Sequence, residues 1–188
     1  MPAPPPEENA KRENWKTLPL PEIRVDLGFT DAYTGGEFGR MRKGVIPREM
    51  EDKWFVFYEE PWLYFHRSWT GACIYGVRFQ ESENRVSTIE SWVNRDTNQY
   101  KETRTDYDRA LLKFLIDAFL LGEHATFPVP SNVPAQAPAG AYQHHLVGRG
   151  YPEAKFSASA QPEVKLSVEV RQPRSFWQRN LAAEDHGQ

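Results

Sequence analysis

The stretch from Glu51 to Phe79 reads EDKWFVFYEEPWLYFHRSWTGACIYGVRF and decides the fold of this chain. It holds ten aromatic side chains, and aromatic runs of this kind, bounded by turn residues, are typical of strands. Turn residues interrupt it at Glu59–Pro61 and in the polar run from His66 to Gly71. The stretch therefore predicts three consecutive antiparallel strands, at residues 53–58, 62–66 and 72–79. In the third strand, alternation predicts one shared face for Cys73, Tyr75, Val77 and Phe79.

The sequence on both sides of this stretch extends the sheet and supplies a helix to cover it. Residues 85–93 predict a fourth strand, and the alternation over Ile23–Leu27 predicts an edge strand. From Asp106 to Leu121, apolar side chains recur at spacings of three and four residues, which is typical of a buried helix. We therefore predict an α+β fold, in which an antiparallel meander of about four to six strands packs against one long helix on its C-terminal side.

The prolines are distributed unevenly along the chain. They crowd the first 21 residues and the stretch from Phe127 to Pro138, whereas residues 50–122 contain only Pro61. Residues 1–19 combine this proline with charge and few large apolar groups, so they cannot bury enough apolar surface to offset the entropy of ordering. We therefore expect residues 1–19 to be a disordered arm.

The remaining residues divide into one domain and a tail. We assign residues 20–130 to a single α+β domain, because they contain all the strands and the helix just described. Residues 131–188 are expected to begin as a proline- and alanine-rich linker. After it, the alternation over Val164–Val170 predicts a strand, and the apolar spacing over Ser175–Ala183 predicts a short amphipathic helix.

Charge and cysteine content narrow the range of functions. The net charge of −3 gives no electrostatic footprint for nucleic acid or anionic lipid, so we predict neither a nucleic-acid nor a membrane partner. Cys73 is the single cysteine, and the first residues lack the apolar core of a secretory signal, so we expect a cytoplasmic protein. His144 and His145 have no further ligand at metal spacing. We therefore predict neither a metal site nor a cofactor.

The polar run inside the aromatic stretch is the strongest candidate for a binding site. Arg67 can grip an anion with its fork of donors, Trp69 offers a stacking face, and Ser68 can supply a hydrogen bond. We therefore predict a ligand-binding site formed by His66, Arg67, Ser68, Trp69 and Thr70. The alternative is a hairpin turn made possible by Gly71, in which these side chains serve only packing and pairing.

Glu51, Asp52 and Lys53 are the predicted partners of this run. Adjacent carboxylates can form an acid/base pair, because like charges in proximity raise the pKa of one of them. Neighbouring side chains on a strand or helix point apart, however, which favours structural pairing of the two carboxylates with Arg48, Lys53 or Arg67. Both interpretations place the three residues near the start of the first central strand.

Two segments together resemble a known family. Gly44–Pro47 followed by Met50–Phe55, and then the run from His66 to Gly71, is similar to a family of small uncharacterised bacterial proteins. Similar segments are also appended to ADP-ribosylglycohydrolase-type enzymes. The resemblance covers about residues 33–130 and implies an accessory or stand-alone domain with no established activity. It implies functional positions at Glu51, Asp52, Lys53, Trp54, His66, Arg67, Trp69 and Thr70.

Three hypotheses of function follow. The first is a non-catalytic binding module that uses the His66–Gly71 run to hold a protein partner or a small anionic, nucleotide-like ligand. The second is an enzyme acting on a nucleotide-like or ADP-ribosylated substrate, with His66 as acid/base and Arg67 as the holder of the anion. It requires His66, Arg67 and a carboxylate to converge on one cavity. The third, a structural subunit or immunity-type partner, requires an exposed aromatic patch.

Overall fold

The computed structural model describes residues 9–49 and 51–128 of the chain. The predicted linker, strand and short helix of residues 131–188 lie outside the described residues, as does the first part of the predicted arm.

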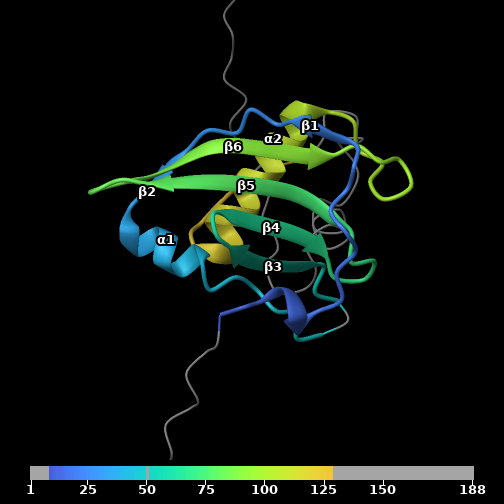
Figure 1. The fold of residues 1–188 in the computed structure, drawn as a ribbon, viewed down its shortest axis with the longest axis horizontal. Helices are drawn as coiled ribbons and strands as arrows, with labels where there is room; N and C mark the ends of the chain where they lie inside the picture. The colour runs from blue at the N-terminus through green and yellow to red at the C-terminus, as the bar shows by residue number, and fades with distance from the viewer. Residues whose placement is uncertain (1–8, 50, 129–188) are drawn as a thin grey trace, which may run out of the picture. The chain divides into compact units, whose positions relative to one another are not determined.

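Six antiparallel strands form one sheet, as Figure 1 shows. The strands are β1 (Arg24–Asp26), β2 (Ala32–Tyr33), β3 (Trp54–Glu59), β4 (Trp62–Arg67), β5 (Cys73–Glu81) and β6 (Val86–Asn94). Their order is β1-β6-β5-β4-β3, and β2 also pairs with β6. The predicted α+β class with an antiparallel meander is confirmed, because the four central strands follow one another along the chain and each pairs with the next.

The helical part of the fold differs from the prediction of one long helix. α1 (Gly35–Met41) is a first helix, whose N-cap Thr34 exchanges hydrogen bonds with Glu37 in a capping box. α2 (Thr105–Phe114) is a second, and it runs directly into the π-helical segment η2 (Leu115–Leu120). The predicted helix is therefore ten residues of α-helix followed by six of π-helix. A single turn of 3-10 helix, η1 (Arg12–Asn14), precedes the sheet.

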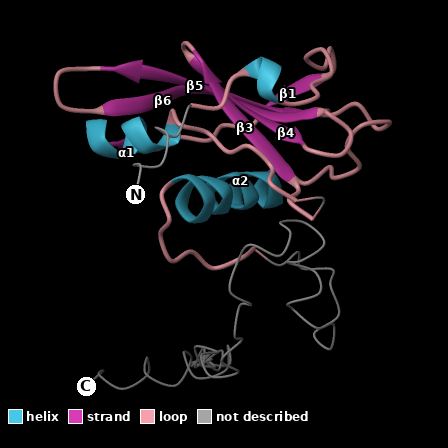
Figure 2. Cartoon of the chain, turned by 90° about the horizontal axis from the view of Figure 1, so that it is seen from below, coloured by secondary structure: helices cyan, strands magenta, loops and turns pink. Residues whose placement is uncertain are grey.

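α2 covers one face of the sheet (Figure 2). Its Leu111 and Leu112 are fully buried in one apolar cluster with Phe65 and Val77 of the sheet. Removing such side chains from water contributes about 1.5–3 kcal/mol each, which makes this cluster the main source of stability. The helical spacing of the apolar residues is thus explained by the face they bury.

The opposite face of the sheet is aromatic and is covered by residues 9–20, hereafter the N-terminal segment. Phe55, Phe57, Tyr64, Cys73 and Trp92 form a second buried cluster on this face, together with Ala10. Trp15 and Leu20 pack against it. In Figure 1 the segment, in blue, leads from η1 to β1. Residues 9–19 therefore differ from the predicted disordered arm, because Ala10 and Trp15 pack on the sheet and Trp15 and Leu18 form hydrogen bonds to residues beyond the segment in sequence.

A β-bulge changes the expected orientation of Cys73. Where β4 pairs with β5, Phe65 faces Tyr75 and His66 faces Cys73, so Ile74 is an extra residue. The bulge breaks the alternation along β5, and Cys73 packs on the opposite face of the sheet from Tyr75. The predicted shared face of Cys73 and Tyr75 is therefore wrong.

Candidate functional site

The predicted polar run forms the end of β4 and the connection to β5, hereafter the β4–β5 turn (Ser68–Ala72). Arg67 closes the turn at both ends, since its N–H donates to the Ala72 carbonyl at 2.9 Å and its carbonyl accepts from Gly71 N–H at 2.8 Å. Gly71 has a φ of 78°, in the left-handed region that favours glycine. The hairpin interpretation of Gly71 is therefore confirmed. A function of the turn then depends on which of its side chains are exposed.

Hydrogen bonds from two separate segments hold the β4–β5 turn in place. On one side, the Ser68 hydroxyl donates to the Asp52 carbonyl at 2.5 Å and Ser68 N–H donates to the Lys53 carbonyl at 3.1 Å. On the other side, Trp15 Nε1 donates to the Ser68 carbonyl at 2.8 Å. Leu18 N–H donates to the Gly71 carbonyl, also at 2.8 Å. The turn is thus fixed between the N-terminal segment and the start of β3.

His66 lies in the aromatic interior beneath the N-terminal segment. Its side chain is fully buried, and its ring stacks on Phe57 with 5.4 Å between the ring centres. Nδ1 donates to the Gly71 carbonyl at 2.9 Å, whereas Nε2 is buried and has no hydrogen-bond partner among the described residues. Burial lowers the pKa of His66, because the charged imidazolium would lose its hydration. His66 is therefore held neutral and supports the turn from below.

Arg67 points to the other face of the sheet. Successive side chains of a strand alternate, so Arg67 lies on the α2 side, with its guanidinium 4.1 Å from the centre of the Trp54 ring. Burial lowers the pKa of Arg67, because the charged guanidinium would lose its hydration. His66 and Arg67 are thus neighbours in sequence whose side chains are separated by the sheet.

The three predicted partners of the run have different roles. Asp52 organises the loop before β3, because its Oδ2 accepts from the backbone N–H groups of Arg48 at 2.8 Å and Glu49 at 3.3 Å. Lys53 reaches over Trp69, with 3.9 Å between Nζ and the centre of the indole ring. Glu51 is half-buried. The structure therefore brings Asp52 and Lys53 to the β4–β5 turn.

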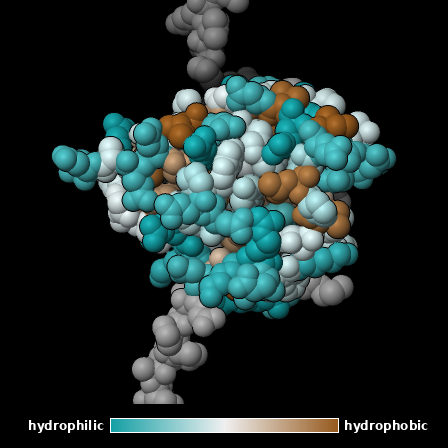
Figure 3. Space-filling model, in the orientation of Figure 1, coloured by the Kyte–Doolittle hydropathy of each residue, from teal (hydrophilic) through white to brown (hydrophobic). Residues whose placement is uncertain are grey.

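Trp69 and Thr70 form the outer surface of the turn. The Trp69 side chain is 61% exposed, the highest exposure of any large apolar residue in the described part of the chain. Thr70 is also exposed, and its hydroxyl accepts from Ala72 N–H at 3.2 Å. The other exposed large apolar residues of the described ranges are Ile23, Val25, Ile46 and Ile89. Trp69 is the one aromatic among them, so these residues give no support to a broad aromatic patch. On the face that Figure 3 shows, the hydrophobic residues form separate spots.

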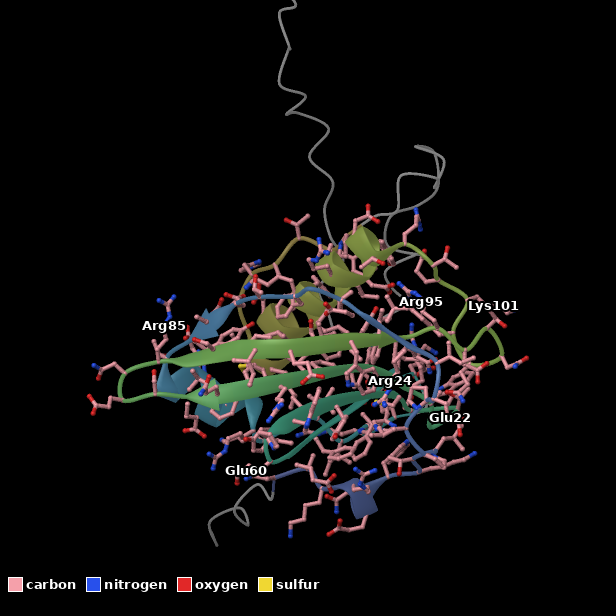
Figure 4. All side chains as sticks on the ribbon, turned by 45° about the horizontal axis from the view of Figure 1, so that its top comes forward. Glu22, Arg24, Glu60, Arg85, Arg95 and Lys101 are labelled. Atoms are coloured by element: carbon pink, nitrogen blue, oxygen red, sulfur yellow. The ribbon has the colours of Figure 1, made fainter. Side chains whose placement is uncertain are left out.

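Sequence reasoning missed a buried polar cluster between β5 and α2. Asp108 of α2 is fully buried, and its Oδ2 lies 2.7 Å from Arg95 Nη2. Its Oδ1 accepts from the Tyr75 hydroxyl at 2.9 Å and from the Tyr100 hydroxyl at 2.5 Å. Burial and the Asp108 charge raise the pKa of Tyr100 far above its usual range. Figure 4 labels Arg95, which follows β6.

One signal in the sequence pointed to this cluster. Asp108 lies one position after Tyr107 and three before Leu111, both of which belong to the buried stripe of the helix, so its carboxylate needed a buried partner. A carboxylate in the first turn of a helix is also favoured by the helix dipole, so this signal is not specific. The cluster joins the sheet to α2 through hydrogen bonds and an ion pair, and we assign it a structural role.

No family model, no curated protein and no solved structure matches this chain. Among the described residues, no helix is long and apolar enough to cross a membrane. The same residues contain no group of three or more histidine, cysteine or carboxylate side chains placed to hold a metal ion.

Proposed function

We propose that this protein is a non-catalytic binding module that recognises a protein partner through the β4–β5 turn, with Trp69 as the anchoring side chain. The observation that carries the proposal is the combination of exposure and fixation at the turn. Trp69 is 61% exposed, while Ser68 before it is hydrogen-bonded to Trp15 and Asp52, and Gly71 after it is hydrogen-bonded to Leu18. A fixed, exposed indole is typical of a binding anchor.

The physical advantage of this arrangement lies in the entropy of binding. Association costs free energy for every side chain and loop that must become ordered at the interface. The backbone of the β4–β5 turn is already fixed by Trp15, Leu18 and Ser68, so that cost is largely absent. Trp69 supplies a large apolar area with few rotatable bonds, and Lys53 beside it adds a positive charge at the rim.

The enzyme hypothesis receives no comparable support from the geometry. It required His66, Arg67 and a carboxylate to converge. His66 lies in the aromatic interior with Phe57, whereas Arg67 lies over Trp54 on the α2 side of the sheet. The Asp52 carboxylate accepts hydrogen bonds from the backbone of its own loop. An acid/base and an anion holder on opposite faces of a sheet cannot act on one substrate.

Site-specific photo-crosslinking tests the proposed function. A photoreactive benzophenone amino acid replaces exposed Thr70 in the full chain, and the same group replaces Ile89, which is 49% exposed, as the matched control. We expect a discrete crosslinked partner from position 70 and none from position 89. The product should be competed by excess unlabelled wild-type protein, and Trp69→Ala should compete about thirtyfold less well, as expected when an anchoring tryptophan is removed.

Two outcomes would contradict the proposal. One is a crosslinked product that Trp69→Ala competes as effectively as the wild type does. The other is that Arg67→Ala, on the opposite face, abolishes competition while Trp69→Ala does not. Circular dichroism of each variant establishes that it is folded before its competition is compared.

A further inference from the structure

β1 (Arg24–Asp26) lies at one end of the strand order, and its backbone hydrogen bonds show which of its groups face outward. Leu27 N–H donates to the Ser91 carbonyl at 3.0 Å, and Arg95 N–H donates to the Ile23 carbonyl at 2.9 Å. In an antiparallel pair, hydrogen-bonded and non-hydrogen-bonded positions alternate along the strand. The odd-numbered residues therefore bond to β6, and the N–H and C=O groups of Arg24 and Asp26 point away from it.

The side chains around β1 are exposed on both faces. Ile23 is 59% and Val25 is 45% exposed, and alternation places them on the same face. Arg24 and Asp26 are exposed on the other face, where the guanidinium of Arg24 lies 5.2 Å from the centre of the Trp92 ring. Figure 4 shows Arg24 close to Glu22. An outer strand with outward backbone groups and exposed β-branched side chains is a ready template for another strand.

The sequence of β1 is complementary to itself in the antiparallel direction. When two copies of the strand are aligned with Val25 opposite Val25, Arg24 of each copy faces Asp26 of the other. Opposite charges directly across a strand pair are stabilising, and like charges are destabilising. Ile23 of each copy then lies opposite Leu27 of the other, whose side chain is buried in its own core, so the exposed apolar contact of the pair is Val25 with Val25.

The hydrogen-bonding pattern selects the same alignment. The outward-facing residues, Arg24 and Asp26, must occupy hydrogen-bonded positions of the new pair, and Val25 must occupy a non-hydrogen-bonded position on the two-fold axis. The alignment on Val25 satisfies both conditions at once. Asp26 Oδ1 accepts from Gly28 N–H at 2.9 Å within its own copy.

We propose that the partner of β1 is a second copy of this chain, joined through antiparallel β1–β1 pairing centred on Val25, so that the two sheets become continuous. Because two-fold pairing uses the same residues on both copies, the contact is closed and stops at a dimer. This interface uses the edge strand and not the β4–β5 turn, so it stands independently of the proposed function.

Disulfide trapping tests the alignment. The chain has one cysteine, Cys73, which is fully buried, so an added cysteine is the reactive thiol. Residues opposite each other at a non-hydrogen-bonded position have Cα atoms about 4.5 Å apart, within the range that a disulfide spans. Under mild oxidation we expect Val25→Cys to form a covalent dimer at least tenfold faster than Ile89→Cys, which is similarly exposed, and than Ile23→Cys, which does not face itself.

A charge exchange tests the pairing without a new covalent bond. Arg24→Asp places two aspartates opposite each other and Asp26→Arg places two arginines, so each variant alone should dimerise about tenfold more weakly than the wild type. An equimolar mixture of the two variants restores both opposite-charge pairs and should recover the dimer in sedimentation equilibrium. A wild-type chain that stays monomeric at every concentration, equal trapping at positions 23, 25 and 89, or a mixture no stronger than its components would overturn the proposal.

Discussion

The two faces of the sheet are covered by very different parts of the chain. On one face, α2 packs a regular stripe of aliphatic residues, including Leu111 and Leu112, against the strands. On the other, the irregular N-terminal segment lies over aromatic rings and reaches them mainly through Trp15 and Leu20. The first face is covered by an amphipathic helix that packs into the main core, whereas the second is covered by a short segment with few apolar contacts.

Because of this difference, the residues that determine global stability are not the residues that hold the proposed site in place. The α2 face carries most of the buried apolar area and the buried polar cluster, so it governs global unfolding. The N-terminal face carries the hydrogen bonds from Trp15 and Leu18 to the β4–β5 turn. A change on the α2 face should therefore alter the free energy of unfolding strongly, and a change on the N-terminal face should alter it less while affecting the turn.

The largest expected effect is at the buried polar cluster of the α2 face. Asp108→Ala removes the fully buried partner of Arg95 and leaves that guanidinium and two tyrosine hydroxyls without their shared acceptor. We expect a loss of about 3–5 kcal/mol in the free energy of unfolding, measured by urea denaturation. Asp106→Ala, at an exposed position of the same helix, is the control and should change it by about 0.5 kcal/mol or less.

A smaller effect is expected where a glycine makes room on the aromatic face. A Cβ at Gly76 would lie 2.3 Å from Cε2 of Trp92, so Gly76→Ala must displace the indole or the backbone. We expect a loss of about 1–3 kcal/mol in urea denaturation. Gly39→Ala is the matched control, since nothing lies within 4 Å of its Cβ, and in the interior of α1 it should stabilise by about 0.5–1 kcal/mol. Equal effects at the two glycines would show that Trp92 does not lie over Gly76.

The pH dependence of stability should reveal the contribution of His66, which is buried beneath the N-terminal segment. Burial lowers the pKa of His66 from its ordinary 6.5, so the folded protein keeps the ring neutral while the unfolded chain protonates it. Its contribution to stability is present above pH 6.5 and is lost as the pH falls, by at most about 1.4 kcal/mol per pH unit. His66→Gln should flatten the slope as the pH falls below 6.5. A slope identical in wild type and His66→Gln would contradict this role.

The smallest expected effect is at the surface pair that ties η1 to β3. Arg12 and Glu59 form a salt bridge in which both side chains are substantially exposed, and Arg12 also lies over the Phe57 ring at 5.2 Å. Arg12→Gln should reduce the free energy of unfolding by about 1 kcal/mol or less, and the loss should shrink as salt is added. A loss as large as that of Asp108→Ala would mean that the two faces do not differ in the way described.

The contrast between the faces also explains what could be predicted from the sequence. The four central strands begin within one residue of their predicted starts, because aromatic and β-branched runs between turn residues are a strong local signal. The helix that covers the α2 side was equally predictable, because apolar residues that recur every three or four positions indicate a buried helical face. The change to π-helix at Leu115 has no comparable signal in the apolar pattern.

The N-terminal cover could not be predicted, because its order depends on contacts with distant residues. Trp15 bonds to Ser68, and Leu18 bonds to Gly71, more than fifty positions along the chain. The segment itself has the composition of a disordered arm. In the candidate site, the opposite orientations of His66 and Arg67 follow from simple alternation, whereas the docking of Lys53 on Trp69 depends on how β3 and β4 are paired.

Amide hydrogen exchange at Leu18 tests most directly whether the N-terminal segment is an integral layer that fixes the β4–β5 turn. The Leu18 N–H donates to the Gly71 carbonyl at 2.8 Å, so we predict strong protection, close to that of the Gly71 amide. Trp15→Ala, which removes the bond to Ser68, should lower the protection of Leu18 and Gly71 together. If the Leu18 amide exchanged at the rate of an unstructured peptide while Gly71 stayed protected, the N-terminal segment would not be the layer that fixes the β4–β5 turn.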